Sequence, residues 1–316
     1  MEMGESIGVP QFVSEDKHNE KVCPWHNPKP KGKSAVMDAQ TPDEDTDVMP
    51  ENLGSKLGEN LGNPPRGEVT IEYKQGTTLR FKQGRKMKSL QTYSKEDDPI
   101  YCYDLQYAPH HLIPGNESLK NSGVVPFLGD TNAIKHFGSD SYIKDGMTVG
   151  YDVNDAKNGV WLPSPYALSM SNQWPSDAGL KVLKKRKDKD LQQTANDTEA
   201  LRMAYVVAAI ETSGKQFHMR HKDYSDKVKE ALNAIGERLE TMADATCPIA
   251  SSSEEDGKID PPMGLPSRLN ALSGNLRRLL IGGVWRAPIF TDKLTKQYAE
   301  ERLARSKAKG NVKKVL

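Results

Sequence analysis

The first half of the chain contains stretches in which apolar and polar residues alternate, as they do in a strand with one buried face. Residues 69–73 read Val-Thr-Ile-Glu-Tyr, and residues 78–82 can return as their hairpin partner after a turn at Gln75-Gly76. Residues 101–107 predict another strand, and residues 159–162 predict a short strand after an Asn-Gly turn. We therefore expect short strands joined as hairpins in this half of the chain.

The second half shows apolar residues at helical spacing. Residues 197–210 predict a helix with Asp197 as its cap and Gly214 as its stop. The next helix is expected to start near Tyr224, because an apolar stripe then advances by four, three, four and three residues. The stripe consists of Val228, Leu232, Ile235, Leu239 and Met242. Such a stripe has to face a core, and we interpret it as core packing rather than a cofactor site.

Composition divides the chain into three regions. Residues 1–65 are rich in Pro, Gly, Asn and Asp and are expected to form an irregular N-terminal segment. Residues 66–245 carry most of the predicted strands and helices, including an inserted stretch, 164–214, that is expected to contain a helix of its own. Residues 246–316 form a C-terminal extension that ends in a polar, basic helix or tail.

The overall composition excludes an integral membrane protein. The chain has 316 residues, of which 36% are hydrophobic and 28% charged, enough for one large domain or two modest ones. No apolar run approaches the ~20 residues that span a bilayer, and the N-terminus lacks the basic and apolar regions of a secretory signal. We expect no membrane partner, and any export would follow a signal-independent route.

The net charge of +1 says little about nucleic acid, but basic residues gather locally at 80–88, 181–189 and 302–314. Phosphate binding needs local positive surface rather than a high total charge. A charge run is more often a solvated face or tail, so none of these clusters is by itself assigned to DNA.

The three cysteines are Cys23, Cys102 and Cys247, an odd number that makes no disulfide framework and fits a reducing cytosol. Cys23-Pro24-Trp25-His26 has the spacing of half a zinc site. A second half with similar spacing is missing, so the expectation is that these residues hold no metal.

Adjacent histidines, His110 and His111, end an apolar stretch. Neighbouring side chains on a strand point to opposite sides, so one histidine can bind a metal while the other faces a substrate. Two structural histidines beside a turn proline would give the same doublet. Two further histidines of the seven in the chain, His218 and His221, precede the second predicted helix.

Three blocks of sequence contain these residues. In residues 107–114 the two histidines are followed by two aliphatic residues and Pro. Residues 152–163 end in Asn-Gly-Val-Trp-Leu-Pro, and residues 217–225 carry spaced histidines and a Tyr that lead into a helix. In this order the blocks resemble the AHH branch of the HNH/endonuclease VII superfamily, over about residues 95–240.

The chain departs from the family pattern at two positions. Pro109 stands between Ala108 and the doublet, whereas the family has an Ala directly before it. The spacing of His218 and His221 is one residue narrower than is common in the family. On a helix, spacings of three and four both place side chains on one face, so chelation by this pair is still expected.

The resemblance implies an α+β fold with a ββα-metal (His-Me finger) nuclease core, a helical insertion and irregular terminal extensions. It implies that His110 is a metal ligand together with His218 and His221, and that His111 is the general base. Imidazole ligands suit Zn²⁺, Ni²⁺ or Co²⁺, whereas Mg²⁺ and Mn²⁺ prefer oxygen. The expected cofactor is a divalent ion, Zn²⁺ or Mg²⁺, with Ni²⁺ or Mn²⁺ as further candidates.

The resemblance implies that Asn158 is the Asn of the superfamily name. It can contact the metal directly or through water, it can shape the loop that orients His111, or it can be only part of a turn. Arg220 and Lys222 flank the last histidine and can hold phosphate oxygens. With His111, Asn158 and Arg220 are the expected catalytic residues.

The function that this resemblance implies is a metal-dependent, low-specificity DNase that acts as an antibacterial toxin. Its partners would be DNA, a cognate immunity protein and a secretion-system spike or adaptor. It would reside in the cytoplasm of a bacterial producer and be delivered into a target cell. One alternative is an HNH endonuclease of restriction or phage type with sequence preference, although no DNA-reading module is evident. The other is a non-enzymatic, zinc-stabilised binding protein, which would leave His111 without a role.

Overall fold

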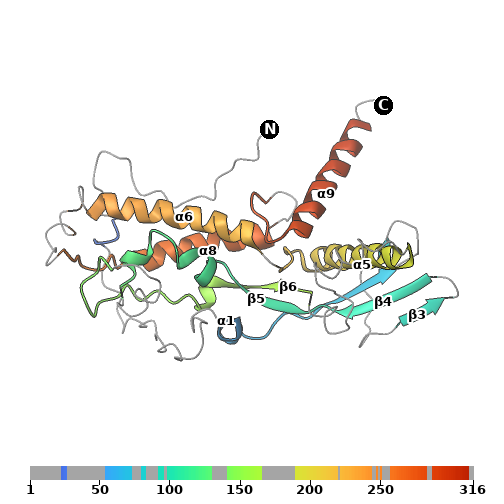
Figure 1. Ribbon diagram of the computed structural model, residues 1–316, viewed down its shortest axis with the longest axis horizontal. Helices are drawn as coiled ribbons and strands as arrows, with labels where there is room; N and C mark the ends of the chain where they lie inside the picture. Colours follow the sequence, from blue (N-terminus) through green and yellow to red (C-terminus); the bar gives the residue numbers. More distant parts are fainter. Residues whose placement is uncertain are drawn as a thin grey trace. The chain divides into compact units, whose positions relative to one another are not determined.

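The structure is a computed structural model with two compact units (Figure 1). The residues it describes are 23–26, 54–72, 80–82, 92–95, 98–129, 141–165, 189–219, 221–243, 247, 250, 257–282 and 287–312. The first unit comprises residues 1–62, 109–160 and 222–278, and the second comprises residues 63–108, 161–221 and 279–316. Each unit combines separate stretches of the chain, so the units do not test the three regions expected from composition. The division into residues 1–65, 66–245 and 246–316 stays a prediction.

The second unit contains an antiparallel sheet of four strands in the order β2-β1-β4-β3. Its strands are β1 (Glu68–Glu72), β2 (Arg80–Lys82), β3 (Thr92–Lys95) and β4 (Asp98–Asp104). Ile71 of β1 lies opposite Phe81 of β2, which confirms the hairpin that the alternating pattern predicts. The strand predicted over residues 101–107 is wrong in its extent, because β4 ends at Asp104 and a separate strand begins at Tyr107.

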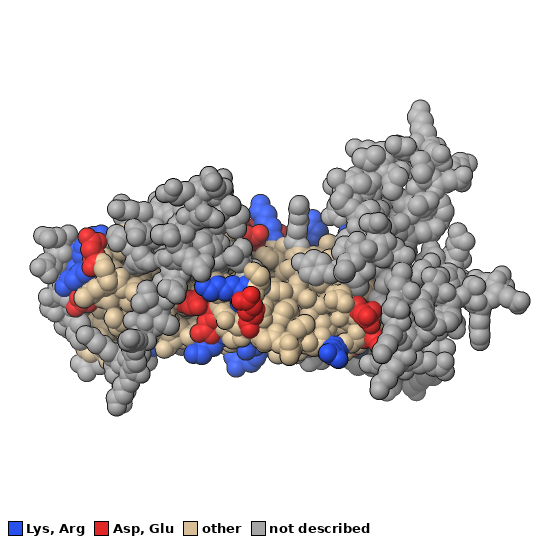
Figure 2. Space-filling view, turned by 90° about the horizontal axis from the view of Figure 1, so that it is seen from below, with Lys and Arg blue, Asp and Glu red and all other residues tan. Residues whose placement is uncertain are grey.

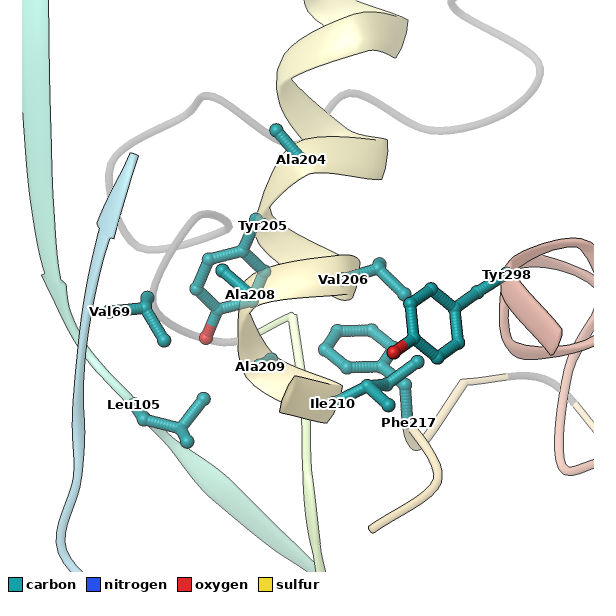
Figure 3. Close-up of a cluster of buried hydrophobic side chains, with 10 residues drawn as sticks. All are labelled: Val69, Leu105, Ala204, Tyr205, Val206, Ala208, Ala209, Ile210, Phe217 and Tyr298. Atoms are coloured by element: carbon teal, nitrogen blue, oxygen red, sulfur yellow. The ribbon is translucent and has the colours of Figure 1, made fainter. Parts of the chain in front are cut away.

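A long helix, α5 (Lys189–Ser213), packs against β1 and forms the core of the second unit. Figure 3 shows Tyr205 of this helix close to Val69 of β1, with the Phe217 ring beside the last turn of the helix. The rings of Tyr205 and Phe217 meet edge to face with centroids 5.9 Å apart. Helix α9 (Lys293–Val312) adds Tyr298 to the same cluster.

Helix α5 confirms the predicted helix of the inserted stretch but corrects its start. It begins at Lys189, so Asp197 lies inside the helix and does not cap it. Its end is as expected: Gly214 has a φ of +68°, and its N–H donates to the Ile210 carbonyl at 2.8 Å. A left-handed residue of this kind is a common helix stop.

The first unit is built around helix α6 (Lys222–Thr241), which begins two residues before Tyr224. The five apolar residues of the predicted stripe are all buried, which confirms that the stripe is a core face. The helix contacts two short helical turns, η2 (Gly115–Leu119) and η3 (Val125–Phe127). Helix α8 (Leu265–Ile281) also lies mostly in this unit.

Two glycines allow α6 to approach the segment after η2. A Cβ added to Gly236 would lie 2.3 Å from the carbonyl carbon and oxygen of Gly123. The amide of Gly123 also donates to the Asn233 side chain at 2.9 Å. The helix and this segment are therefore in direct backbone contact.

The histidine doublet lies at the end of β5 (Tyr107–His111), which pairs with β6 (Gly159–Pro163) in a two-stranded sheet. The Leu112 amide donates to the Asn158 carbonyl at 2.8 Å, and the Ser164 amide donates to the Gln106 carbonyl at 2.9 Å. These bonds at the two ends fit an antiparallel pair, as the sequence predicts for these two segments.

A helix, α1 (Gly54–Leu61), lies within the N-terminal segment that the sequence predicts to be irregular. Leu57 of this helix is fully buried, and a Cβ added to Gly159 would come within 2.6 Å of its Cδ1 atom. The prediction for residues 1–65 is therefore wrong in this part. The described residues have a mixed, α+β architecture, and no helix among them is long and apolar enough to cross a membrane.

Candidate metal centre

The two histidines of β5 lie on opposite sides of the strand. Burial alternates along β5, with His110 buried (1% exposed) and His111 partly exposed. The His110 ring meets the Tyr224 ring edge to face, with centroids 5.0 Å apart. The alternation is the one expected of a strand, and it separates the two imidazoles in the way a ligand and a base have to be separated.

Tyr224 connects the first turn of α6 to the end of the histidine strand. Its hydroxyl donates to the Leu112 carbonyl at 2.7 Å. Burial raises the pKa of Tyr224 well above its ordinary value, so the phenol stays neutral and remains a donor. Tyr224 thus holds the backbone beside the doublet in place and packs against His110.

His111 has a polar partner that the sequence does not suggest. Its Nε2 atom lies 3.0 Å from Oδ1 of Asn154, a buried residue. Because an amide oxygen only accepts, Nε2 carries the proton in the neutral ring and Nδ1 is the basic nitrogen. The Asn154 backbone is itself fixed, since its amide donates to Asp152 Oδ1 at 2.8 Å and its carbonyl accepts from Asn60 Nδ2 at 2.7 Å.

Asn158 is fully buried, and both the oxygen and the nitrogen of its side-chain amide form hydrogen bonds. Its Oδ1 accepts from the Ile113 amide at 2.8 Å and from Ser273 Oγ at 2.9 Å. Its Nδ2 donates to the Ile113 carbonyl at 3.1 Å and to the Val153 carbonyl at 2.8 Å. Of the roles left open by the sequence, these contacts favour the second: Asn158 holds the segment after His111 against the segment that carries Asn154.

The turn that contains Asn158 is further supported from α8. Arg277 Nη2 donates to the carbonyls of Ala156 and Gly159, both at 2.6 Å. These carbonyls belong to the turn η4 (Ala156–Asn158) and to the residue that follows it. Neither Ser273 nor Arg277 belongs to a recognisable motif, so their part in this turn depends on tertiary structure alone.

His218 and His221 lie just before α6 rather than on it, since the helix begins at Lys222. The argument from helical spacing therefore does not apply to this pair. Their rings are nevertheless neighbours, with centroids 5.7 Å apart, and both are partly buried. The His218 amide donates to the Pro163 carbonyl at 2.7 Å, which fixes the segment at the end of β6.

The three histidines expected to be ligands are divided between the two units, with His110 in the first and His218 and His221 in the second. Within the second unit, the neighbouring rings of His218 and His221 can offer two imidazole nitrogens to one ion. A ligand set that joins all three histidines stays a prediction. Arg220 lies outside the described residues.

Comparison with known proteins identifies the family. Residues 95–247 match AHH, a nuclease family of the HNH/ENDO VII superfamily with conserved AHH. The match covers all three sequence blocks and agrees with the resemblance that they carry. No curated protein and no solved structure matches the chain.

Proposed function

We propose that this chain is a metal-dependent endonuclease that hydrolyses phosphodiester bonds in DNA with low sequence specificity. The observation that carries the proposal is the arrangement of the doublet: His111 is oriented by Asn154, while His110 points to the other side of β5. This arrangement lies in the part of the chain that matches a nuclease family.

By the resemblance to the nuclease family, His110, His218 and His221 would hold the ion. When bound, a divalent ion polarises the scissile phosphate and neutralises charge on the leaving oxygen. Three imidazoles favour Zn²⁺, Ni²⁺ or Co²⁺, whereas Mg²⁺ or Mn²⁺ would need phosphate and water oxygens to complete the site. We propose Zn²⁺ or Mg²⁺ as the ion used by the enzyme.

The proton is handled by His111. Nδ1 of the neutral ring takes the proton from the attacking water, while the Nε2 proton stays hydrogen-bonded to Asn154. The amide dipole of Asn154 then stabilises the imidazolium and keeps the ring in one orientation. In this pair Asn154 orients the histidine base, as a third residue does in other sites where a histidine activates a nucleophile.

The surface gives some support to low specificity. Among the described residues, Figure 2 shows Lys and Arg interspersed with Asp and Glu on the face that it displays. Phosphate contacts would then come from single cations beside the site, and we propose Arg220 and the exposed Lys222 for this role. Contacts to phosphate carry no sequence information.

The experiment is digestion of a plasmid with purified protein, with EDTA and after addition of single metals. General degradation that EDTA stops supports the proposal, whereas discrete fragments would identify an endonuclease with sequence preference. Absence of cleavage under every metal would leave a zinc-stabilised binding protein as the better description. His136→Ala, at a histidine outside the three sequence blocks, is the matched control for variants of the site.

We further propose that the nuclease is an antibacterial toxin, because AHH domains resemble the toxic domains of secreted bacterial effectors. The producer would then need an immunity protein, and delivery would need a secretion-system spike or adaptor. Expression in a bacterial cytoplasm should degrade DNA and stop growth, and co-expression of the neighbouring small reading frame should restore growth. Harmless expression of an active nuclease in a cell without such a neighbour would overturn the toxin role.

A further inference from the structure

A second group of metal-ligating side chains lies in the first unit, away from the nuclease motif in sequence. It consists of Cys23, His26 and Cys247, whose ligand atoms all lie within 4.8 Å of one another. Both cysteines are buried, and His26 is partly exposed. The half-site Cys-x-x-His that the sequence shows at residues 23–26 thus meets a third ligand from a position 224 residues after Cys23.

The first two ligands, Cys23 and His26, come from a turn whose two middle residues are hydrogen-bonded to another segment. The His26 amide donates to the Cys23 carbonyl at 3.2 Å, which brings both side chains to one end of the turn. Trp25 Nε1 donates to the Asp260 carbonyl at 2.9 Å, and the Pro24 carbonyl accepts from the Gly264 amide at 3.0 Å. The turn is therefore fixed against the segment that leads into α8.

The third ligand is fixed at the end of α6. The Cys247 amide donates at 2.9 Å to the carbonyl of Met242, the residue that follows the end of α6 at Thr241. The amide of Ala250 points at Cys247 Sγ from 3.5 Å. A backbone N–H directed at sulfur is the kind of outer contact that supports a metal-bound thiolate.

The distance between the two sulfurs is that of metal ligands rather than of a disulfide. Cys23 Sγ and Cys247 Sγ lie 3.6 Å apart, and the two cysteines do not form a disulfide. A disulfide requires about 2.05 Å. Two thiolates on a tetrahedral zinc ion, each at about 2.3 Å, lie about 3.8 Å apart.

A reactive cysteine is the other use of such a thiol, and the surroundings disfavour it. Cys23 and Cys247 are both buried, so neither thiol has access to solvent. Reactive cysteines instead lie where solvent and substrates can reach the sulfur.

We propose that Cys23, His26 and Cys247 bind a structural zinc ion that fastens the N-terminal turn to the end of α6. Two thiolates and one imidazole are a donor set that selects zinc among the common divalent ions. The fourth position is taken by water or by one further donor. The sequence-based expectation that the half-site holds no metal is then wrong, because its partner is a single cysteine rather than a second pair with similar spacing.

The test uses Co²⁺ as a spectroscopic substitute for zinc in the full-length, reduced, metal-stripped protein. Thiolate bound to Co²⁺ gives a charge-transfer absorption in the near ultraviolet, whereas the imidazole group of the nuclease site does not. We expect this absorption to saturate by two equivalents of Co²⁺, because the proposed histidine site also takes up Co²⁺, and to disappear when Zn²⁺ is added. This result is independent of nuclease activity, so failure here and failure of the proposed function are separate.

Three variants assign the absorption to residues. Cys23→Ser and Cys247→Ser should abolish it, and Cys102→Ser, which changes the remaining cysteine, should leave it intact. His26→Cys keeps a ligand and adds a third thiolate, so it should bind Co²⁺ with a stronger absorption even if the serine variants unfold. The proposal is overturned if wild type shows no thiolate absorption, if Cys102→Ser removes it, or if His26→Cys leaves it unchanged. A Cys23–Cys247 disulfide in protein kept free of oxidants would also overturn it.

Discussion

Nε2 of His111 lies 3.0 Å from Oδ1 of Asn154, and this contact defines which nitrogen of the proposed base takes up a proton. Asn154 contributes its side chain only after its own backbone has been fixed by Asp152 and by Asn60 of α1. A base on a strand is thus oriented by a loop residue that a helix from the N-terminal segment supports.

We expect Asn154→Ala to lower kcat by ~10–100-fold, as loss of an orienting partner commonly does. The ring of His111 would remain but would lose its fixed tautomer. Asn275→Ala, at an α8 residue that bonds Arg278, is the matched control. Steady-state kinetics on a plasmid substrate checks this. In a double variant with His111→Ala, the Asn154 change should add little, because the two residues act as a unit; fully multiplicative losses would contradict the pairing.

The two histidines of the doublet should behave differently when replaced. His111→Ala should reduce the rate by ~10²–10⁴-fold while bound metal stays near the wild-type amount, because a general base is not a ligand. His110→Ala should lose the metal as well as the activity. Metal analysis beside activity assays measures both. Loss of metal in step with activity in His111→Ala would show that the assignment of the two residues is wrong.

Replacement of Tyr224 tests the link between α6 and β5. Tyr224→Phe keeps the ring against His110 but removes the donor to the buried Leu112 carbonyl. An unsatisfied buried acceptor costs about 1–3 kcal/mol, so the free energy of unfolding should fall by that amount in urea titrations. Tyr142→Phe, at an exposed tyrosine, should change it by less than about 0.5 kcal/mol. Equal effects of the two changes would argue against the link.

The pattern of apolar residues was sufficient to predict the elements but not their partners. Period-two and helical spacing located the β1–β2 hairpin, β6 and the buried face of α6, since burial of one face determines the pattern directly. The start of α5 was missed because residues before Asp197 carry little apolar signal, and helix ends are the least certain part of such predictions.

Some residues of the candidate site can be predicted from the sequence, and others only from the folded structure. The doublet and the two later histidines were found from their blocks, whereas the roles of Asn154 and Ser273 depend on segments brought together by folding. Gly159 shows why local rules do not suffice. The Asn-Gly pair predicts a turn, but Gly159 has an extended backbone, and its lack of a side chain makes room for Leu57. No spacing rule connects residues about a hundred positions apart.

Asp292 should make the stability of the second unit depend on pH. Burial raises its pKa, although its carboxylate accepts bonds from Leu294 and Thr295 at the start of α9. A folded-state pKa above the unfolded value means that the folded protein binds more protons, so the contribution of this group falls as pH rises above about 4. Asn caps a helix about as well as Asp.

Thermal unfolding of Asp292→Asn between pH 4 and pH 7 measures this effect. The stability of the variant relative to wild type should increase across this range, because only the wild-type residue has to bury a charge as the pH rises. Asp223→Asn, an exposed carboxylate in the first turn of α6, controls for the loss of one negative charge. A constant difference between Asp292→Asn and wild type would show that burial does not perturb this carboxyl group.

A pair of glycine substitutions in two helices tests the close approach of α6 to the segment after η2. In Gly236→Ala the new Cβ would lie 2.3 Å from the backbone of Gly123, so the helix has to shift and the variant should lose about 1–3 kcal/mol of stability. Gly274→Ala in α8 meets no atom within 4 Å, and it should gain about 0.5–1 kcal/mol from the better helix propensity of Ala. Urea unfolding of both variants gives the sign of each change directly.

Gly274→Ala also controls for helix propensity, since both changes replace Gly by Ala inside a helix. A difference in sign between the two variants therefore comes from the close approach at Gly236. Stabilisation by Gly236→Ala would mean that α6 does not approach this segment as closely as the structure shows.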